Sequence, residues 1–277
     1  MASKKVAFQG ERGAYSEVAA RSLLGDKIVP VTCDSFETLF ERVEKKRADL
    51  GVIPIENSLV GSIHKNYDLL LEYNLKVIGE VQLRVSHALI AAPGISFKKI
   101  SKVYSHPMAL EQCRKFFKRH KKIAPISYYD TAGAVKMLAE SGLTNSAAIA
   151  SPFAAQIHKM KILKQAIEDE KHNYTKFLLL SRTPIQFKGK AKTSIVFSLK
   201  SEPGALFKAL SVFALRNIDL TKIESRPSRQ KAWQYYFYVD FDGGAKEERV
   251  HHALDHLAEI THFIKILGSY PYRVDAF

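Results

Sequence analysis

Short apolar runs and longer amphipathic segments alternate over the first ~180 residues of the chain. The apolar runs predict strands, and they lie at residues 6–9, 50–54, 103–105, 126–129 and 147–150. The amphipathic segments predict helices, and they lie at residues 16–24, 35–46, 107–120, 131–140 and from 152 onward. Strands that alternate with helices are typical of βαβ units, so we expect an α/β fold with a mainly parallel sheet.

The pattern changes between residues 75 and 92, where strand-like residues at 77–79 and 81–91 follow each other without a helix. Such a stretch predicts a crossover between two lobes. We expect one lobe to comprise about residues 1–80 with 160–185, and the other about residues 81–159. A cleft between two lobes is a natural place for a ligand.

A second pattern begins after residues 182–192, a basic segment with Pro184 and Gly189 that predicts a linker. Strand-like and helix-like segments then follow in the order βαββαβ, at 193–200, 204–216, 220–225, 233–241, 247–260 and 263–270. This order predicts a small ferredoxin-like domain over residues 193–277. We expect apolar residues of its first helix and third strand to form the core: Leu206, Phe207, Ala209, Leu210, Phe213, Phe237 and Tyr238.

Charge adds a hint about the ligand. The chain has 277 residues with a net charge of +14, and the first 190 residues hold 30 basic and 18 acidic residues. A positive field concentrates small anions, whereas no nucleic-acid motif accompanies the charge, so a nucleic-acid-binding regulator is a distant alternative. No apolar run approaches the ~18 residues of a membrane span, and the N-terminus lacks the pattern of a signal peptide. We therefore expect a cytoplasmic protein that binds neither nucleic acid nor membrane, with Cys33 and Cys113 as reduced thiols.

Three strand-to-helix junctions could bind an anion. Polar residues precede the predicted helices at Ser105, at Asp130 with Thr131, and at Ser151. In a parallel sheet these helix starts collect at one edge, where unpaired backbone N–H groups favour a carboxylate or phosphate. The same residues could also serve only as helix caps.

Two loops and one strand add polar groups. Gly10 and Gly13 flank a turn whose small residues allow close approach, and residues 54–58 carry a polar triplet after a buried-looking strand. Strand alternation places Asn173, Thr175 and Phe177 on one face. Each pattern alone also fits an ordinary turn or strand.

Taken together, these segments resemble the prephenate dehydratase family. The motifs, in chain order, are Gly10-x-x-Gly-Ala-Tyr-Ser, Pro54-Ile-Glu-Asn-Ser, Ser105-His-Pro-Met-Ala, Asp130-Thr-Ala-Gly-Ala and Asn173-x-Thr-Lys-Phe. Beyond the linker, Gly204-Ala-Leu and Glu224-Ser-Arg-Pro resemble the effector motifs of that family's ACT domain. The resemblance implies a two-lobed, periplasmic-binding-protein-like catalytic region over residues 1–185 and an ACT regulatory domain over 193–277.

The resemblance also implies a reaction, the decarboxylating loss of water from prephenate to give phenylpyruvate. Thr175 would be the catalytic donor, and substrate would be bound by Glu56, Asn57, Ser58, Ser105, Thr131, Ala132, Asn173, Lys176 and Phe177. L-Phenylalanine would act as effector at an interface between ACT domains of a dimer or a dimer of dimers. Its binding residues would be Gly204, Ala205, Leu206, Asn217, Asp219, Leu220, Glu224, Ser225, Arg226 and Pro227.

Two residues depart from the family pattern and keep alternatives open. Lys176 stands where the family usually has Arg, and Met108 stands where it usually has Gln. Lys keeps the charge but loses the planar fork that binds a carboxylate through two hydrogen bonds. An arogenate dehydratase, with Val135 as a position that could select the substrate, and a non-catalytic amino-acid sensor are the alternatives.

The remaining motifs argue against other chemistry. The sequence has no Cys/His cluster with metal-ligand spacing and no G-x-S-x-G elbow, so we expect neither a metal nor an organic cofactor. His64, His106 and His172 are candidate acids, and we expect most of them to be surface or structural residues.

Overall fold

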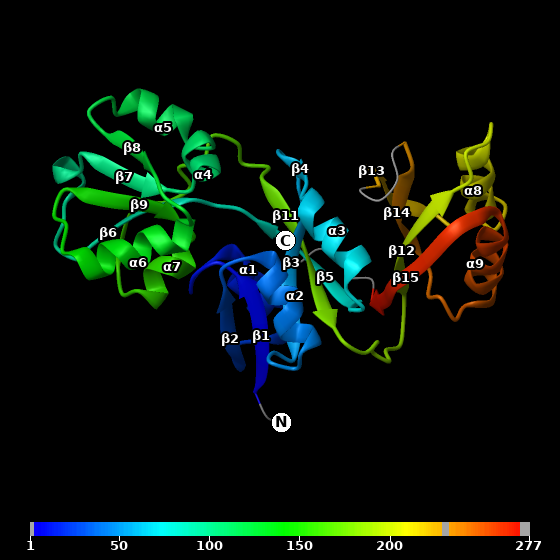
Figure 1. The fold of residues 1–277 in the computed structure, drawn as a ribbon. Coiled ribbons are helices and arrows are strands. Elements are labelled where there is room, and N and C mark those ends of the chain that lie inside the picture. Colours follow the sequence, from blue (N-terminus) through cyan, green and yellow to red (C-terminus); the bar gives the residue numbers. More distant parts are fainter. Residues whose placement is uncertain (1–2, 229–232, 272–277) are drawn as a thin grey trace. The chain divides into compact units, whose positions relative to one another are not determined.

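The computed structural model describes residues 3–228 and 233–271 (Figure 1). The chain divides into two compact units. One unit contains residues 1–66 and 81–177, and the other contains residues 67–80 and 178–277. The end of the predicted domain, residues 272–277, lies outside the described residues.

The first lobe is built on a sheet with the strand order β2-β1-β3-β11-β5. Strand β1 runs parallel to β2 and β3, and the short β4 pairs antiparallel with β3. The elements of this lobe are β1 (Lys4–Gln9), α1 (Tyr15–Leu24), β2 (Ile28–Cys33), α2 (Phe36–Glu44), β3 (Leu50–Asn57), β4 (Gly61–Ser62), α3 (His64–Glu72), β5 (Lys76–Arg84) and β11 (Tyr174–Ser181).

The second lobe is built on a mixed sheet with the order β10-β6-β9-β7-β8. Strand β7 runs parallel to β8 and β9, whereas β6 runs antiparallel to β9 and β10. The elements are β6 (Ala88–Ala91), the 3₁₀ helix η1 (Phe97–Lys99), β7 (Lys102–Ser105), α4 (Pro107–Glu111), α5 (Arg114–Arg119), β8 (Ala124–Ser127), α6 (Thr131–Ser141), β9 (Ser146–Ala150), α7 (Pro152–Ile157) and β10 (Lys161–Lys164).

The structure confirms the two-lobed α/β organisation but corrects the division between the lobes. Strand β5 belongs to the first sheet through Arg84, and Lys161–Lys164 pairs with β6 in the second sheet. The predicted boundaries at 81 and 159 were therefore a few residues too early. The predicted helix over 107–120 is two short helices, α4 and α5, because the chain leaves helical geometry at Cys113, whose side chain is buried in the core.

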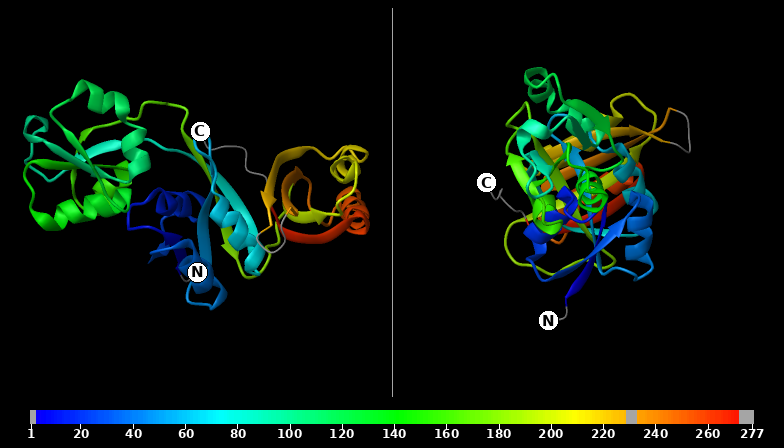
Figure 2. Two further views of the ribbon diagram at one scale, coloured as in Figure 1. Left: turned by 45° about the horizontal axis from the view of Figure 1, so that its top comes forward. Right: turned by 90° about the vertical axis from the view of Figure 1, so that its left-hand side faces the viewer.

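The second unit contains a four-stranded antiparallel sheet, β13-β14-β12-β15. Helices α8 and α9 lie on one side of it (Figure 2) and bury Phe213 and Leu257 against Phe197 and Phe241. The βαββαβ order of the ACT domain is thus confirmed, with the elements β12 (Ala191–Leu199), α8 (Ala205–Ala214), β13 (Leu220–Pro227), β14 (Tyr235–Asp242), α9 (Glu248–Ile260) and β15 (Thr261–Pro271).

Two residues predicted for the core of this domain are exposed. Phe213 and Tyr238 are buried as expected, but Phe207 is 76% exposed and Leu206 also faces outward. Ala209 and Phe213, one helical turn apart, are buried as expected, whereas the first turn of α8 is exposed. Within the described part of the chain, no helix has the length and apolar character needed to span a bilayer.

Candidate functional site

Thr175 lies in a cluster of amide side chains where the neighbouring strands β3 and β11 of the first sheet end and begin. The side-chain nitrogen Nδ2 of Asn57, at the end of β3, lies 2.9 Å from Thr175 Oγ1 and 2.8 Å from Asn173 Oδ1. It also lies 3.2 Å from the carbonyl oxygen of Tyr174. Three residues that the sequence predicted for one site, more than a hundred positions apart, are therefore in direct contact.

The direction of these hydrogen bonds follows from the backbone. The N–H groups of Leu59 and Val60 both donate to Asn57 Oδ1, each at 3.0 Å. A group that accepts from two N–H donors must be the carbonyl oxygen of the amide, so Nδ2 is the donor toward Thr175. The Thr175 hydroxyl accepts this bond, which leaves its own hydrogen available for another acceptor. Thr175 can therefore donate to a bound ligand.

Ser58 holds the loop that follows β3 against the strand that carries Thr175. Its hydroxyl donates to the carbonyl oxygen of His172 at 3.0 Å and accepts from the Tyr174 N–H at 2.9 Å. Its own N–H donates to the Tyr174 carbonyl. The hydroxyl that was predicted to bind substrate is thus engaged with the backbone.

The cluster continues into residues that sequence reasoning missed. Asn173 is fully buried, and its Nδ2 donates to Gln112 Oε1 at 3.2 Å. The same oxygen lies 2.9 Å from His87 Nε2, and His87 Nδ1 lies 3.2 Å from the hydroxyl of Tyr15. Burial lowers the pKa of His87 and raises that of Tyr15 well above its ordinary value. No local spacing in the sequence connects these residues, because each comes from a different segment.

Glu56 and Lys176, both predicted as substrate ligands, contact each other. Lys176 Nζ lies 3.8 Å from a carboxylate oxygen of Glu56. Each residue is one position along its strand from Asn57 or Thr175, so strand alternation directs both to the opposite face of the sheet. Phe177 shares the Thr175 face, and both residues are buried there, at 2% and 8% exposure.

The helix starts of the second lobe lie together as predicted. Strands β8, β7 and β9 are parallel neighbours and lead into α6, α4 and α7. The caps are Asp130, Ser151 and His106; the last replaces the expected Ser105. Ser105 is buried in the strand and donates to the Ile149 carbonyl at 2.6 Å. Ala132 packs in the core of this lobe, and Thr131 is the first residue of α6.

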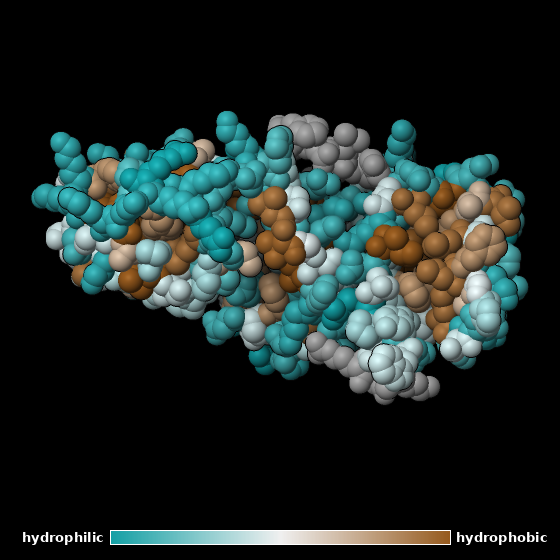
Figure 3. Space-filling view, turned by 90° about the horizontal axis from the view of Figure 1, so that it is seen from above, coloured by the Kyte–Doolittle hydropathy of each residue, from teal (hydrophilic) through white to brown (hydrophobic). Residues whose placement is uncertain are grey.

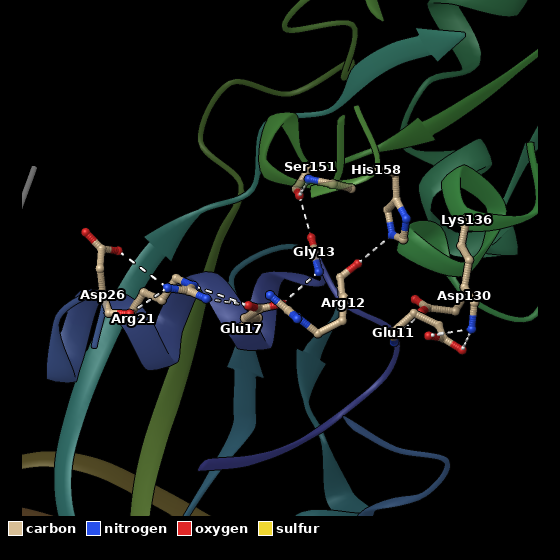
Figure 4. A network of polar contacts seen from close by, with 11 residues as sticks. Glu11, Arg12, Gly13, Glu17, Arg21, Asp26, Asp130, Lys136, Ser151 and His158 are labelled. Carbon is tan, nitrogen blue, oxygen red and sulfur yellow. Dashed lines mark hydrogen bonds and ion pairs between the residues drawn. The ribbon is translucent and has the colours of Figure 1, made fainter. Parts of the chain in front are cut away.

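The glycine loop of the first lobe reaches the second lobe (Figure 4). The Glu11 N–H donates to Asp130 Oδ2 at 2.9 Å, and the Ser151 hydroxyl donates to the Gly13 carbonyl at 2.6 Å. Gly13 has φ +91°, and a Cβ there would lie 2.5 Å from the Cα of Ala154. The close approach that the sequence predicted is therefore with helix α7 of the protein itself.

The buried carboxylate of Glu17 holds the glycine loop in place. Its carboxylate accepts from the Gly13 N–H at 2.9 Å and from Arg12 at 3.0 Å, and it pairs with Arg21 at 2.9 Å (Figure 4). Burial alone would raise the pKa of Glu17, but the bonds from Arg12, Gly13 and Arg21 hold it below the ordinary value.

The predicted effector residues lie on the ACT domain. Gly204, with φ +76°, precedes α8, and Ala205 and Leu206 line a hollow of about 690 Å³ together with Trp233 and His262. Asn217 has φ +52° and ends the turn after α8, just before Asp219 and Leu220, where β13 begins. Glu224, Ser225, Arg226 and Pro227 all lie in β13, an edge strand of the sheet.

Arg226 has a partner within its own unit. Its guanidinium lies 3.3 Å from both carboxylate oxygens of Asp68 in α3, and both side chains are 13% exposed. The same helix is held by Lys265 of β15, whose Nζ donates to the carbonyl oxygens of Leu70, Leu71 and Tyr73 at 2.8–3.0 Å. A cation at the end of a helix satisfies its last carbonyl groups. The predicted effector motif is thus joined to α3 through Arg226, and Lys265 holds the end of the same helix.

The side chains of the other candidate residues lie outside the hydrogen-bonded cluster around Thr175. His64 and His172 have exposed side chains, and His106 accepts from the Met108 N–H as a helix cap. Val135, which could select between substrates, is fully buried in the core of the second lobe. Over the described residues, no group of three or more His, Cys, Asp or Glu side chains is arranged to hold a metal ion.

Comparison with known proteins identifies the family. Residues 6–185 match the prephenate dehydratase family, and residues 193–250 match the ACT domain. The chain is 48% identical to "Arogenate dehydratase/prephenate dehydratase 2, chloroplastic" of Arabidopsis thaliana, over 96% of this chain and 72% of the relative. The chain therefore belongs to the prephenate dehydratase family and carries its ACT domain.

Two solved structures share the whole architecture. One is a prephenate dehydratase from Arthrobacter aurescens in complex with L-Phe, with a TM-score of 0.88 at 32% identity, covering 97% of this chain and 90% of that one. The other is GqqA, described as a novel type of quorum quenching acylase, with a TM-score of 0.89 at 32% identity, covering 98% of each chain.

Proposed function

We propose that this dehydratase acts on prephenate and forms phenylpyruvate in L-phenylalanine biosynthesis. The observation that carries the proposal is the Thr175 hydroxyl, which accepts from Asn57 and so has its own hydrogen free to donate. The bond from the ring to the carboxylate breaks and releases carbon dioxide. Its electron pair enters the ring, and the ring hydroxyl leaves. Taking up one proton, that hydroxyl departs as water, so prephenate and one proton give phenylpyruvate, carbon dioxide and water.

Thr175 lowers the barrier by donating a hydrogen bond to the departing oxygen. A threonine hydroxyl is a weak acid, so its contribution is stabilisation of the developing charge, an effect worth roughly 10²–10³-fold for a single donor. The proton that completes the water comes from solvent through this hydroxyl. Phe177 lies on the same strand face and is buried, which supports a dry environment beside Thr175.

The anionic groups of the substrate would face the helix starts of the second lobe. Thr131 begins α6, and backbone N–H groups at a helix start favour carboxylates. Lys176 lies beside Glu56, so we propose that it contributes positive potential rather than a direct bond. Both cysteines are free and buried, which fits the reducing cytoplasm that we propose for this enzyme.

Arogenate is the second candidate substrate, because the Arabidopsis relative is named for both activities. Arogenate carries an amino group where prephenate has a keto group. Val135 is buried in the core, so it could select between them only by shifting its neighbours.

We further propose that L-phenylalanine binds between ACT domains of two copies of the chain and regulates turnover. The motif residues Gly204 and Leu206 are exposed, and Phe207, Leu215 and Ile223 are exposed apolar residues of the same domain. Figure 3 shows apolar surface on this domain, at the right of the view. Exposed apolar side chains in this number favour contact with a second copy. The solved relative that contains L-Phe supports the identity of the effector.

The direct test is phenylpyruvate formation from prephenate at mildly alkaline pH, with and without phenylalanine, and with arogenate in a parallel reaction. A reaction without enzyme corrects for spontaneous decay of prephenate. Turnover of prephenate that phenylalanine changes is the expected result. Preference for arogenate would transfer the proposal to that substrate, and binding of phenylalanine without turnover of either would leave an amino-acid sensor.

A further inference from the structure

We propose that His87 and Gln112 are positioning residues for Thr175, acting through a chain of hydrogen bonds that orients its hydroxyl. The inference rests on the proposed function, since it assigns how the donor of that reaction is held. Neither residue contacts Thr175, so neither is a catalytic residue. The chain runs from Thr175 through Asn57, Asn173 and Gln112 to His87.

Each bond in the chain has only one direction. The Leu59 and Val60 N–H groups make Asn57 Oδ1 an acceptor, so Asn57 Nδ2 donates to both Thr175 and Asn173 Oδ1. Asn173 then presents Nδ2 to Gln112, whose atom at 3.2 Å must be the carbonyl oxygen. An amide turned the other way at any step would place two donors against each other.

His87 is the last donor in the chain. Because Gln112 Oε1 is an acceptor, His87 Nε2, at 2.9 Å, must carry a hydrogen. His87 is 2% exposed, and burial lowers its pKa. Its Nδ1 lies 3.2 Å from the Tyr15 hydroxyl, which donates its own hydrogen to the Ser86 carbonyl at 2.6 Å. The His87 backbone N–H donates to the buried carboxylate of Glu168, which holds the ring in place. The hydrogen on Nε2 is therefore set by the acceptor that Gln112 presents.

This series of hydrogen bonds connects elements of both lobes. Gln112 ends α4 in the second lobe, His87 lies in the crossover between β5 and β6, and Asn173 lies in the return crossover before β11 (Figure 1). Asn57 and Thr175 belong to the sheet of the first lobe. The orientation of the donor hydroxyl therefore depends on contacts that span both crossovers.

Removal of the His87 donor should act on kcat. His87→Phe keeps a ring of similar size but leaves Gln112 Oε1 with one donor fewer, so Asn173 and Asn57 gain freedom to turn. We expect kcat to fall about tenfold, or about 1.4 kcal/mol, with KM within twofold of the wild type. His87→Gln, whose amide nitrogen can replace Nε2–H, should recover most of the loss. A residue that only supports the fold would show no such recovery.

A double-mutant cycle separates positioning from general damage. In a Thr175→Ala background His87→Phe should lower kcat no further, because its effect passes through the missing hydroxyl. An equal tenfold fall in that background would overturn the proposal, as would wild-type kcat in a folded His87→Phe protein. If His87→Phe fails to fold, Gln112→Met removes the shared acceptor from a half-buried position, and the same tenfold loss is expected.

A spectroscopic test is independent of the reaction. Nitrogen-15 NMR of histidine-labelled protein, with the His87 signal assigned from His87→Gln, should show the neutral Nε2–H tautomer. In Gln112→Met this preference should weaken. A wild-type His87 that carries no hydrogen on Nε2 would overturn the chain of hydrogen bonds, whatever the substrate. If instead neither prephenate nor arogenate is turned over while the Nε2–H tautomer is present, the proposed function fails and the hydrogen-bonded chain stands.

Discussion

The Thr175 cluster and the effector motifs of the ACT domain are built in opposite ways. The cluster around Thr175 consists of one buried and two half-buried amides that hydrogen-bond to each other: Asn173, Asn57 and Gln112. The effector motifs lie at an exposed helix start and on an edge strand. Buried polar networks hold one geometry when every member is satisfied, whereas exposed motifs leave their groups open to a partner. The first region is therefore complete in one chain, and the second offers a surface to another.

The sharpest challenge to this comparison is Asn57→Asp. The new carboxylate keeps an acceptor for the Leu59 and Val60 N–H groups, so the loop should stay in place. It cannot donate to Thr175, whose hydrogen would turn toward the carboxylate instead of the substrate. We expect kcat to fall by roughly 10²–10³-fold, measured as phenylpyruvate formation in a protein that circular dichroism shows to be folded. A fall of less than threefold would mean that the amide does not orient the donor.

The next effect should be on stability. Gly13→Ala adds a Cβ that would lie 2.5 Å from Ala154 Cα at a residue with φ +91°. We expect a loss of about 2–3 kcal/mol in the free energy of unfolding, measured by urea denaturation. Gly25→Ala is the matched control, because Gly25 has φ +79° but open space around its Cβ position. Equal losses in the two variants would show that backbone strain, rather than contact between the lobes, decides the role of Gly13.

The stability that Glu17 contributes through the glycine loop should depend on pH. Its pKa is lower in the folded protein than its ordinary value of 4.5, so its contribution is present above that pH and is lost as pH falls through the folded value. Glu17→Gln should cost about 2 kcal/mol at pH 7, and the difference from the wild type should shrink in acid. Thermal melts from pH 7 to pH 3 measure this. A difference that does not change with pH would contradict the charge-based explanation.

The smallest expected effect concerns the effector region. Asp68→Asn removes the charge that holds Arg226, so Arg226 becomes free to bind the effector carboxylate. The phenylalanine concentration for half-maximal response should fall about three- to fivefold, or about 1 kcal/mol, while kcat without phenylalanine stays within twofold. Asp255→Asn, which alters an exposed pair on α9, is the control and should change neither value. An unchanged response in Asp68→Asn would remove Arg226 from effector binding.

The sequence carried more information about elements than about the site. Apolar runs and helical periodicity predicted β7 to β9 and α6 to α9 closely, and α9 shows the reason, since its buried residues recur at helical spacing. Helix α3 was not predicted; residues 67–72, most of the helix, belong to the second unit, and its buried positions include Asn66 and Tyr67. Periodicity cannot reveal a polar buried face.

Within the site, motifs predicted Asn57, Asn173 and Thr175 together, but not the residues that hold them. His87 and Gln112 come from separate segments, and only the fold brings them to Asn173. Residue type alone also did not reveal which neighbouring group a polar side chain would contact. Lys176 was expected to bind substrate, and Ser105 to cap a helix, but the structure pairs the first with Glu56 and buries the second against Ile149.

The central claim is that the Thr175 hydroxyl donates to the departing oxygen. The most direct measurement compares wild-type, Thr175→Ser and Thr175→Ala proteins for both prephenate binding and single-turnover formation of phenylpyruvate. The account predicts that Thr175→Ala lowers the rate by at least about 100-fold with binding within threefold, and that Thr175→Ser, which keeps the hydroxyl, recovers most of the rate. A Thr175→Ala protein that forms phenylpyruvate at nearly the wild-type rate would contradict it.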